Sequence, residues 1–204
     1  AASDVYKRQS NMDADMDQRQ QPYHIPLLGE HQIVNAEAAI TVLHTLYIEE
    51  TAIRKGIAQT AWLGRMTKVS EHPRIYVDGA HNAAAWEYLR TSVEKYFTNC
   101  RVVYIIGVLK DKEYEKMVEI LAPTMAAAVV ITPDTPRGLP KEILAPLLQE
   151  KGVPVQLADT SAEALQKARR QAGETDVILV SGSLSFLAEY LQLESGDERH
   201  GTSR

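Results

Sequence analysis

The residues best suited to chemistry form one run, Asp-Gly-Ala-His-Asn at positions 78–82, directly after an apolar segment that ends at Val77. A carboxylate at the end of a strand can accept hydrogen bonds from a ribose. The imidazole of His81 can contact phosphate or transfer a proton, and Asn82 can cap a following helix. The alternative is that Asp78 and Asn82 only stabilise a tight turn, and the residue types by themselves favour neither interpretation.

Two later loops also follow apolar runs and carry groups that could bind a ligand. In Gly-Val-Leu-Lys-Asp (107–111), Gly107 allows a close backbone approach and Lys110 offers a positive charge to an anionic substrate. In Ser-Gly-Ser (181–183), hydroxyls and backbone amides at a helix start could hold a carboxylate or phosphate. A solvated lysine and an ordinary helix cap at Ser183 are the competing interpretations. The second loop lacks the Gly-x-Ser-x-Gly pattern of a serine hydrolase.

Earlier in the chain, Asn35 and Arg65 are candidates for contacting a nucleotide. An asparagine amide can both donate to and accept from an adenine edge, and a guanidinium on a connector can reach a phosphate. A solvent-facing Asn35 and an Arg65 stacked on Trp62 are the alternatives. A single cysteine, Cys100, provides no zinc-binding cluster. Neither a Gly-x-Gly-x-x-Gly nor a P-loop motif occurs in these residues.

Alternating strand and helix patterns position these loops. After residue 73, apolar runs predict strands at 75–77, 101–108, 127–131, 154–157 and 176–180. Helical spacing predicts helices at 83–97, 114–121, 141–150, 162–172 and 184–193. Continuous apolar strands suit a sheet that is covered on both faces. We therefore expect an α/β fold with a Rossmann-like, doubly wound, mostly parallel sheet that binds ligands at the carboxyl ends of its strands.

The first part of the chain has a different organisation. Residues 1–21 are polar and without period, and we expect a disordered or non-native lead-in. A strand is predicted at 23–28, helices at 33–48 and 51–60, and a connector at 61–73. Three residues before the first helix, Glu30, His31 and Gln32, could cap it. The polar residues 194–204 are expected to form a frayed tail.

Composition excludes several classes of function. The 204 residues include 22 Lys and Arg against 27 Asp and Glu, a net charge of −5, which disfavours sequence-independent binding of nucleic acid. The longest apolar stretch, 102–109, is far shorter than the ~20 residues of a membrane-spanning helix. The single cysteine favours a reducing compartment, and we expect a cytoplasmic protein.

Five short motifs, taken in order, resemble the folylpolyglutamate synthase/dihydrofolate synthase family of the Mur ligase superfamily. They are Leu-Leu-Gly-Glu-His-Gln-Ile-Val-Asn-Ala (27–36), Trp-Leu-Gly-Arg (62–65), Val-Asp-Gly-Ala-His-Asn (77–82), Gly-Val-Leu-Lys-Asp-Lys (107–112) and Ser-Gly-Ser-Leu (181–184). The resemblance covers about residues 22–192. It implies that residues 22–61 end a central ATPase domain and that residues 62–193 form the carboxyl-terminal glutamate ligase domain.

The resemblance also implies an activity, the ATP-dependent ligation of L-glutamate to a folate. The γ-phosphoryl group moves to a carboxylate, the amine of glutamate attacks the acyl phosphate, and Mg²⁺ offsets charge during the transfer. The implied roles are adenine contact for Asn35, phosphate contact for Arg65, ribose contact for Asp78, a place beside the nucleotide for His81, and glutamate binding for Lys110 and Ser183. Arg65, His81 and Lys110 are the implied catalytic residues.

Some family features are replaced or missing. Leu63 and Ala83 stand where the family usually has proline. The P-loop and the magnesium ligands of the family would lie upstream, so we expect a fragment that is inactive alone and whose full-length parent is monomeric. Two alternatives stay open: a fragment of a peptidoglycan Mur ligase, and a non-catalytic α/β nucleotide-binding module. A frame that extends upstream through a P-loop would favour a ligase, and a native start near Met12 would favour the module.

Overall fold

The computed structural model describes residues 4–6, 21–183 and 187–190. The chain divides into two compact units, residues 1–63 (unit 1) and 64–204 (unit 2). Each unit is built around its own apolar core. We describe the two units separately, beginning with unit 2 because it holds most of the predicted site residues.

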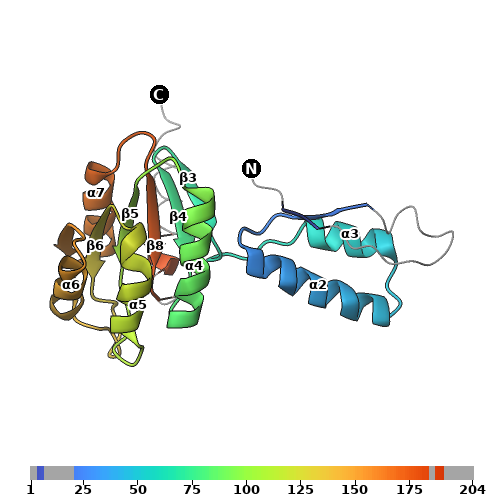
Figure 1. The fold of residues 1–204 in the computed structure, drawn as a ribbon, viewed down its shortest axis with the longest axis horizontal. Helices are drawn as coiled ribbons and strands as arrows, with labels where there is room; N and C mark the ends of the chain where they lie inside the picture. The colour runs from blue at the N-terminus through green and yellow to red at the C-terminus, as the bar shows by residue number, and fades with distance from the viewer. Residues whose placement is uncertain (1–3, 7–20, 184–186, 191–204) are drawn as a thin grey trace. The chain divides into compact units, whose positions relative to one another are not determined.

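In the described part of unit 2, six strands form one sheet in the order β3-β4-β8-β5-β6-β7 (Figure 1). The pairs β4–β8, β8–β5, β5–β6 and β6–β7 are parallel, whereas β3 runs antiparallel to β4. The bounds are β3 Thr67–Glu71, β4 Arg74–Asp78, β5 Val102–Ile106, β6 Ala127–Ile131, β7 Val155–Ala158 and β8 Val177–Ser181. The predicted α/β, mostly parallel sheet is confirmed.

Helices cover both faces of this sheet. Their bounds are α4 Ala83–Tyr96, α5 Tyr114–Leu121, α6 Lys141–Glu150 and α7 Ser161–Gln171, with a short 3₁₀ turn at Ala122–Thr124. α4 and α5 pack against each other and lie in front of the sheet in Figure 1. Tyr104 of β5 points to this face, where its hydroxyl lies 2.7 Å from the hydroxyl of Thr124. The neighbouring residues Val103 and Ile105 belong to the core cluster on the other face, with Leu165 of α7.

The central strands are continuous apolar runs because both their faces are buried. Every residue of β5, β6 and β8 is buried, as expected for a parallel sheet covered by helices on both sides. The core cluster facing α7 takes alternate residues from each strand, and Leu187 and Tyr190 complete it. The helix predicted at 184–193 falls partly outside the described residues, and its residues 187–190 are helical.

One strand of the sheet contradicts the sequence-based prediction. The expected connector at 61–73 contains β3, which pairs with β4 along the edge of the sheet. Its sequence, Thr-Lys-Val-Ser-Glu, has a single apolar residue, and only Val69 of this strand packs against the main core. A polar edge strand takes its conformation from hydrogen bonds to its neighbour, so its own pattern gives little signal.

The described residues of unit 1 form two short strands and two helices, β1 Asp4–Tyr6, β2 Tyr23–Ile25, α2 Glu30–Thr45 and α3 Glu50–Ala58. β1 pairs antiparallel with β2, a strand that the sequence pattern did not predict. α2 begins after Gly29, whose φ of 111° suits glycine. Glu30, His31 and Gln32 therefore lie inside the helix rather than capping it. Tyr23, Ile40 and Ile53 form a small core between these elements.

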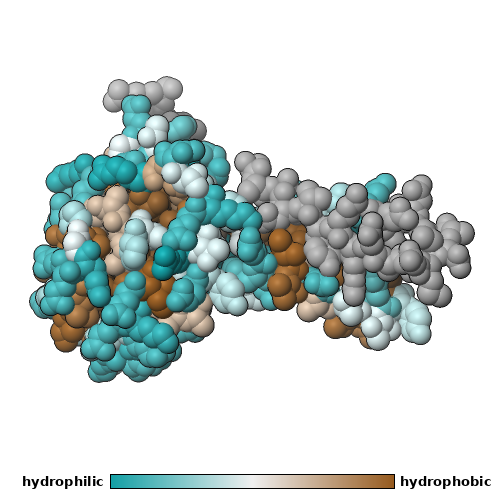
Figure 2. Space-filling model, in the orientation of Figure 1, coloured by the Kyte–Doolittle hydropathy of each residue, from teal (hydrophilic) through white to brown (hydrophobic). Residues whose placement is uncertain are grey.

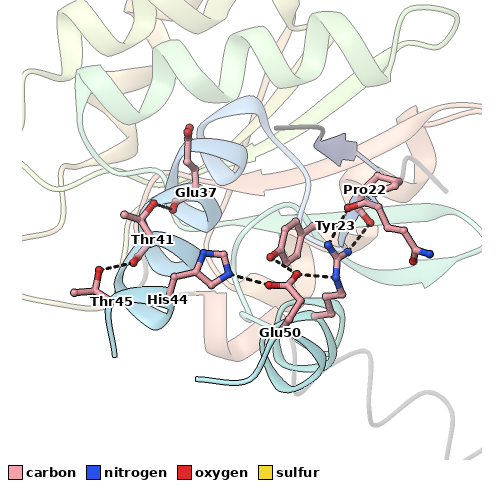
Figure 3. Close-up of polar contacts among 9 residues, drawn as sticks. Pro22, Tyr23, Glu37, Thr41, His44, Thr45 and Glu50 are labelled. Atoms are coloured by element: carbon pink, nitrogen blue, oxygen red, sulfur yellow. Dashed lines mark hydrogen bonds and ion pairs between the residues drawn. The ribbon is translucent and has the colours of Figure 1, made fainter. Parts of the chain in front are cut away.

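A polar network around Glu50 ties the elements of unit 1 together (Figure 3). The hydroxyl of Tyr23 donates to Oε1 of Glu50 at 2.6 Å, and Nε2 of His44 lies 2.8 Å from Oε2. Nε of Arg54 lies 2.7 Å from Oε1, and its guanidinium stacks over the Tyr23 ring at 4.2 Å. Through Glu50, α3 is thus held to both β2 and α2.

The outer surface of α2 is also apolar. Val34, Val42 and Leu46 are 66%, 57% and 63% exposed and fall at spacings of four and eight residues, whereas Ala36 and Ile40 face the small core. Figure 2 shows apolar residues at the surface of this unit. A helix with apolar residues on two faces needs other polypeptide packed against both.

No helix in the described ranges is long and apolar enough to cross a membrane.

Candidate functional site

Hydrogen bonds join the loops at the carboxyl ends of β4, β5 and β8, and the carbonyl oxygen of Ala80 accepts three of them. This oxygen accepts hydrogen bonds from Nε1 of Trp86 at 3.1 Å, from the backbone N–H of Gly182 at 3.1 Å and from the hydroxyl of Ser181 at 3.3 Å. The N–H of Gly107 donates to the carbonyl of Ser181 at 3.4 Å. Three loops that are far apart in the sequence therefore join in one place, which we call the strand-end cluster.

Glycine is required where two of these loops touch. Gly182 has a φ of +121°, and a Cβ atom at this position would lie 2.4 Å from the carbonyl oxygen of Gly107. This oxygen belongs to the backbone and not to a flexible side chain, so it cannot move aside. The loops after β5 and β8 thus approach backbone to backbone, as the sequence predicted for Gly107 but not for Gly182.

Asp78 ends β4 and binds backbone groups on two sides. Its Oδ2 accepts from the N–H of Met66 at 2.9 Å, and its Oδ1 accepts from the N–H of Ala80 at 2.8 Å. The residue is only 6% exposed. Asp78 therefore links the turn before β3 to the turn after β4, in line with the turn-stabilising alternative that the sequence left open.

Arg65 is held close to this carboxylate. It stands in a turn in which the N–H of Gly64 donates to the hydroxyl of Thr67 at 3.0 Å and the carbonyl of Gly64 accepts from the N–H of Gly79 at 2.7 Å. Arg65 is half-buried, and its guanidinium makes no ion pair or hydrogen bond with the residues that the structure describes. An unpaired guanidinium at this position can bind an anion in a bidentate way.

His81 and Asn82 complete the turn after β4. Nδ1 of His81 lies 2.7 Å from the carbonyl oxygen of Gly79. Because a carbonyl can only accept, Nδ1 donates this hydrogen bond. The side chain of Asn82 accepts from the N–H of Ala85 at 2.8 Å and caps α4, as predicted. Asn82 is therefore used in the fold, while Nε2 of His81 makes no hydrogen bond with the residues that the structure describes.

The structure separates the other predicted site residues. Ser183 follows β8 and is 3% exposed, next to the strand-end cluster. Lys110 is exposed on the loop after β5, and its N–H donates to the carbonyl of Arg137 at 2.8 Å in the loop after β6. Asn35 lies in unit 1, exposed on α2, and its amide donates to Oε1 of Gln32 at 3.1 Å. The cluster therefore holds Arg65, Asp78, His81 and Ser183, but not Lys110.

Two features at the carboxyl ends of the parallel strands were not predicted from the sequence. The first is Arg137, which pairs with Asp111, 26 residues away, so that no local pattern indicates the pair. A cavity of about 710 Å³ lies at the carboxyl ends of β6 and β7. Its lining is rich in hydroxyls and carboxylates, including Thr132, Asp159 and Ser161. Among the described residues, no group of three or more His, Cys, Asp or Glu could hold a metal ion.

Comparison with known proteins places this chain in a class. Residues 64–184, most of unit 2, match the family model described as Mur ligase, glutamate ligase domain. The dihydrofolate synthase/folylpolyglutamate synthase of Bacillus subtilis is 30% identical over 171 residues, which is 80% of this chain and 39% of that protein. The chain therefore belongs to the Mur ligases and, within them, to the folylpolyglutamate synthase/dihydrofolate synthase family. The resemblance seen in the motifs is confirmed.

Solved structures agree with this assignment. The structure titled "E.coli FolC in complex with DHPP and ADP" superposes with a TM-score of 0.78 and 31% identity, covering 86% of this chain and 41% of that one. A folylpolyglutamate synthase/dihydrofolate synthase from Yersinia pestis, titled as complexed with AMPPNP and Mn ion, gives 0.74 and 26% identity, covering 84% and 40%. The chain thus spans about two fifths of the length of these relatives.

Proposed function

We propose that this chain is the carboxyl-terminal part of an ATP-dependent ligase that joins L-glutamate to a folate through an acyl phosphate. The observation that carries the proposal is the strand-end cluster, where the turns bearing Arg65 and His81 are bonded to each other through Gly64 and Gly79. A guanidinium without a partner among the described residues, in a turn bonded to the turn that carries an imidazole, suits a phosphoryl group that gains charge during transfer. The names of the relatives describe enzymes of this class, and two of their structures hold nucleotides.

Each predicted residue has a role in this proposal. Arg65 binds the phosphates, and His81 lies beside the nucleotide. Asp78 fixes the turn that carries Arg65 and keeps the ribose contact as a second task, since a carboxylate has about four lone-pair positions. Ser183 and Lys110 bind the incoming glutamate, and Asn35 contacts the adenine.

The proposal assigns the magnesium ligands and the P-loop to the part of the relatives that this chain does not span. The described residues offer no cluster for a metal, and the sequence has no P-loop motif. When bound, magnesium supplies charge neutralisation on the phosphates. The residues of this chain contribute positioning and electrostatics, which are the main protein contributions to phosphoryl transfer.

The test compares this chain with a version joined to the upstream part of the Bacillus subtilis relative. ATP-dependent incorporation of L-glutamate is measured with dihydropteroate and with folylmonoglutamate as acceptors. We expect activity only in the joined protein, and we expect Arg65→Ala to reduce its turnover more than its affinity for folate. Nucleotide binding without ligation by either protein would contradict the proposal and favour a binding module. Ligation of a peptidoglycan precursor instead would favour a peptidoglycan Mur ligase.

A further inference from the structure

The loops that follow β5 and β6, residues 107–112 and 132–140, are joined along their length, and we call them the loop pair. The N–H of Leu139 donates to the carbonyl of Val108 at 2.9 Å, and the N–H of Lys110 donates to the carbonyl of Arg137 at 2.8 Å. Between these two bonds, Leu109 and Gly138 form an isolated antiparallel bridge. The two loops thus form one small antiparallel ribbon beyond the carboxyl ends of β5 and β6.

A two-point ion pair closes the loop pair. Nη2 of Arg137 lies 2.5 Å from Oδ2 of Asp111, and Nε lies 3.3 Å from Oδ1. Hydrogen bonding to the guanidinium lowers the pKa of Asp111, and the same contact raises the pKa of Arg137. Nζ of Lys112 lies 3.9 Å from the same carboxylate. A bidentate arginine–carboxylate pair fixes orientation as well as distance.

Three successive residues make these contacts, which fix the backbone around Lys110. Leu109 is in the bridge, the N–H of Lys110 is bonded to Arg137, and Asp111 is in the ion pair. The ammonium group of Lys110 makes no contact with a described residue, and the residue is exposed. Arg137 supplies both the carbonyl and the guanidinium anchors. A lysine that served only solubility would not need a backbone held in this way.

We propose that Arg137 is a positioning residue that, together with Asp111, holds Lys110 where its ammonium group meets a carboxylate of the incoming glutamate. The inference rests on the proposed function, because it takes Lys110 as a glutamate ligand. Arg137 acts through Lys110 and does not itself touch the substrate. A preset cation loses less conformational freedom on binding than a mobile one.

The first experiment tests positioning without any ligand. Amide hydrogen exchange at Lys110 is measured in the 204-residue chain, with Arg137→Ala and with Lys151→Ala as a matched control. Lys151 forms a comparably exposed pair with Glu119 at 3.3 Å, remote from Lys110 in sequence. We expect Arg137→Ala to speed exchange at Lys110 about fivefold, the scale of one exposed ion pair, and the control to leave it unchanged. Unchanged exchange in Arg137→Ala would overturn the inference alone.

The second experiment measures the affinity of the chain for L-glutamate in a double-mutant cycle. We expect Arg137→Ala to weaken binding about fivefold. In a Lys110→Ala background, Arg137→Ala should have no further effect, since its action passes through Lys110. Full additivity would give Arg137 a contact of its own and overturn the positioning role. A third outcome is faster exchange at Lys110 in Arg137→Ala together with no glutamate binding by any variant. This outcome would overturn the glutamate site, and therefore both this inference and that part of the proposed function.

Discussion

At the scale of single residues, the turn after β4 shows how one side chain can serve fold and site together. Asp78 uses its two oxygens to bind the backbone N–H groups of Met66, which follows Arg65, and of Ala80, which precedes His81. The sequence alone left open whether Asp78 contacts a ribose or only stabilises a turn. Its burial and its two hydrogen bonds give it a structural role.

We predict that Asp78→Ala lowers the free energy of unfolding by about 2–4 kcal/mol, because two buried N–H groups lose their acceptor. Asp78→Asn should cost about half as much, since one oxygen remains. Urea unfolding of the purified chain measures both values. Asp134→Ala is the control, because Asp134 is exposed and makes no hydrogen bond with a described residue. Equal midpoints for Asp78→Ala and the control would remove the structural role.

Residue types and positions could be predicted at this scale, but partnerships could not. Asp78, His81 and Asn82 were found because they follow an apolar run, and the cap at Asn82 is confirmed. The bond from Asp78 to Met66 depends on the hairpin of β3 and β4, and β3 left no clear pattern. The pair Asp111–Arg137 likewise exists only because β5 and β6 are neighbours in the sheet.

At the scale of elements, the buried strands and the edge strand β7 were predictable, whereas the other edge strand, β3, was not. The run predicted at 127–131 has the same bounds as β6, and that at 176–180 is one residue from β8. These strands carry their own signal, because burial on both faces demands apolar residues throughout. β3 lacks this signal, because it is an edge strand in which four of the five residues are polar.

The contact between the loops after β5 and β8 gives a prediction for two glycines. We expect Gly182→Ala to destabilise unit 2 by about 3 kcal/mol or more, because strain at positive φ is added to a backbone clash. Gly152→Ala is the matched control, since Gly152 also has a positive φ, +82°, but has open space around its Cβ position. It should cost about 1 kcal/mol. Thermal unfolding of both variants measures the difference, and equal losses would show that the clash is relieved elsewhere.

The Glu50 network predicts how the stability of unit 1 depends on pH. Burial pushes the pKa of Glu50 up, but hydrogen bonds from Tyr23 and His44 and the charge of Arg54 outweigh it and leave the pKa below its ordinary value. Ionised Glu50 therefore stabilises the folded unit above the unfolded pKa of about 4.3, and this stabilisation is lost as pH falls through the folded pKa.

We expect Glu50→Gln to remove most of this pH dependence. Urea unfolding at pH 7 and pH 3, followed through amide signals of α3, measures it. Glu49→Gln provides the comparison, because Glu49 is the exposed neighbour at the start of the same helix. A wild-type unit that is equally stable at both pH values would show that the network contributes nothing.

At the scale of the whole molecule, the two units differ in the size of their cores and in how completely their apolar residues are buried. Unit 2 has a six-stranded sheet with helices on both faces. Unit 1 has a core of three buried residues and a helix, α2, whose second apolar face is exposed. Relatives that are about twice as long have additional polypeptide that could cover such a face.

We predict that the purified chain self-associates through α2. Sedimentation velocity should show an average mass that rises with concentration, and the double variant Val42→Glu, Leu46→Glu should lower it because charges replace exposed apolar side chains. Ile143→Glu changes a single exposed apolar residue on α6 and should leave association unchanged. A wild-type chain that stays monomeric at all concentrations would contradict the prediction.

The hydrogen bond from Trp86 to Ala80 provides a built-in optical reporter. Only two tryptophans occur in the chain; Trp86 is fully buried with its indole bonded one residue from His81, whereas Trp62 is 64% exposed. Their emission should separate by wavelength, and the indole proton of Trp86 should give its own magnetic resonance signal. Nucleotide titrations can therefore be followed at the strand-end cluster without any attached dye.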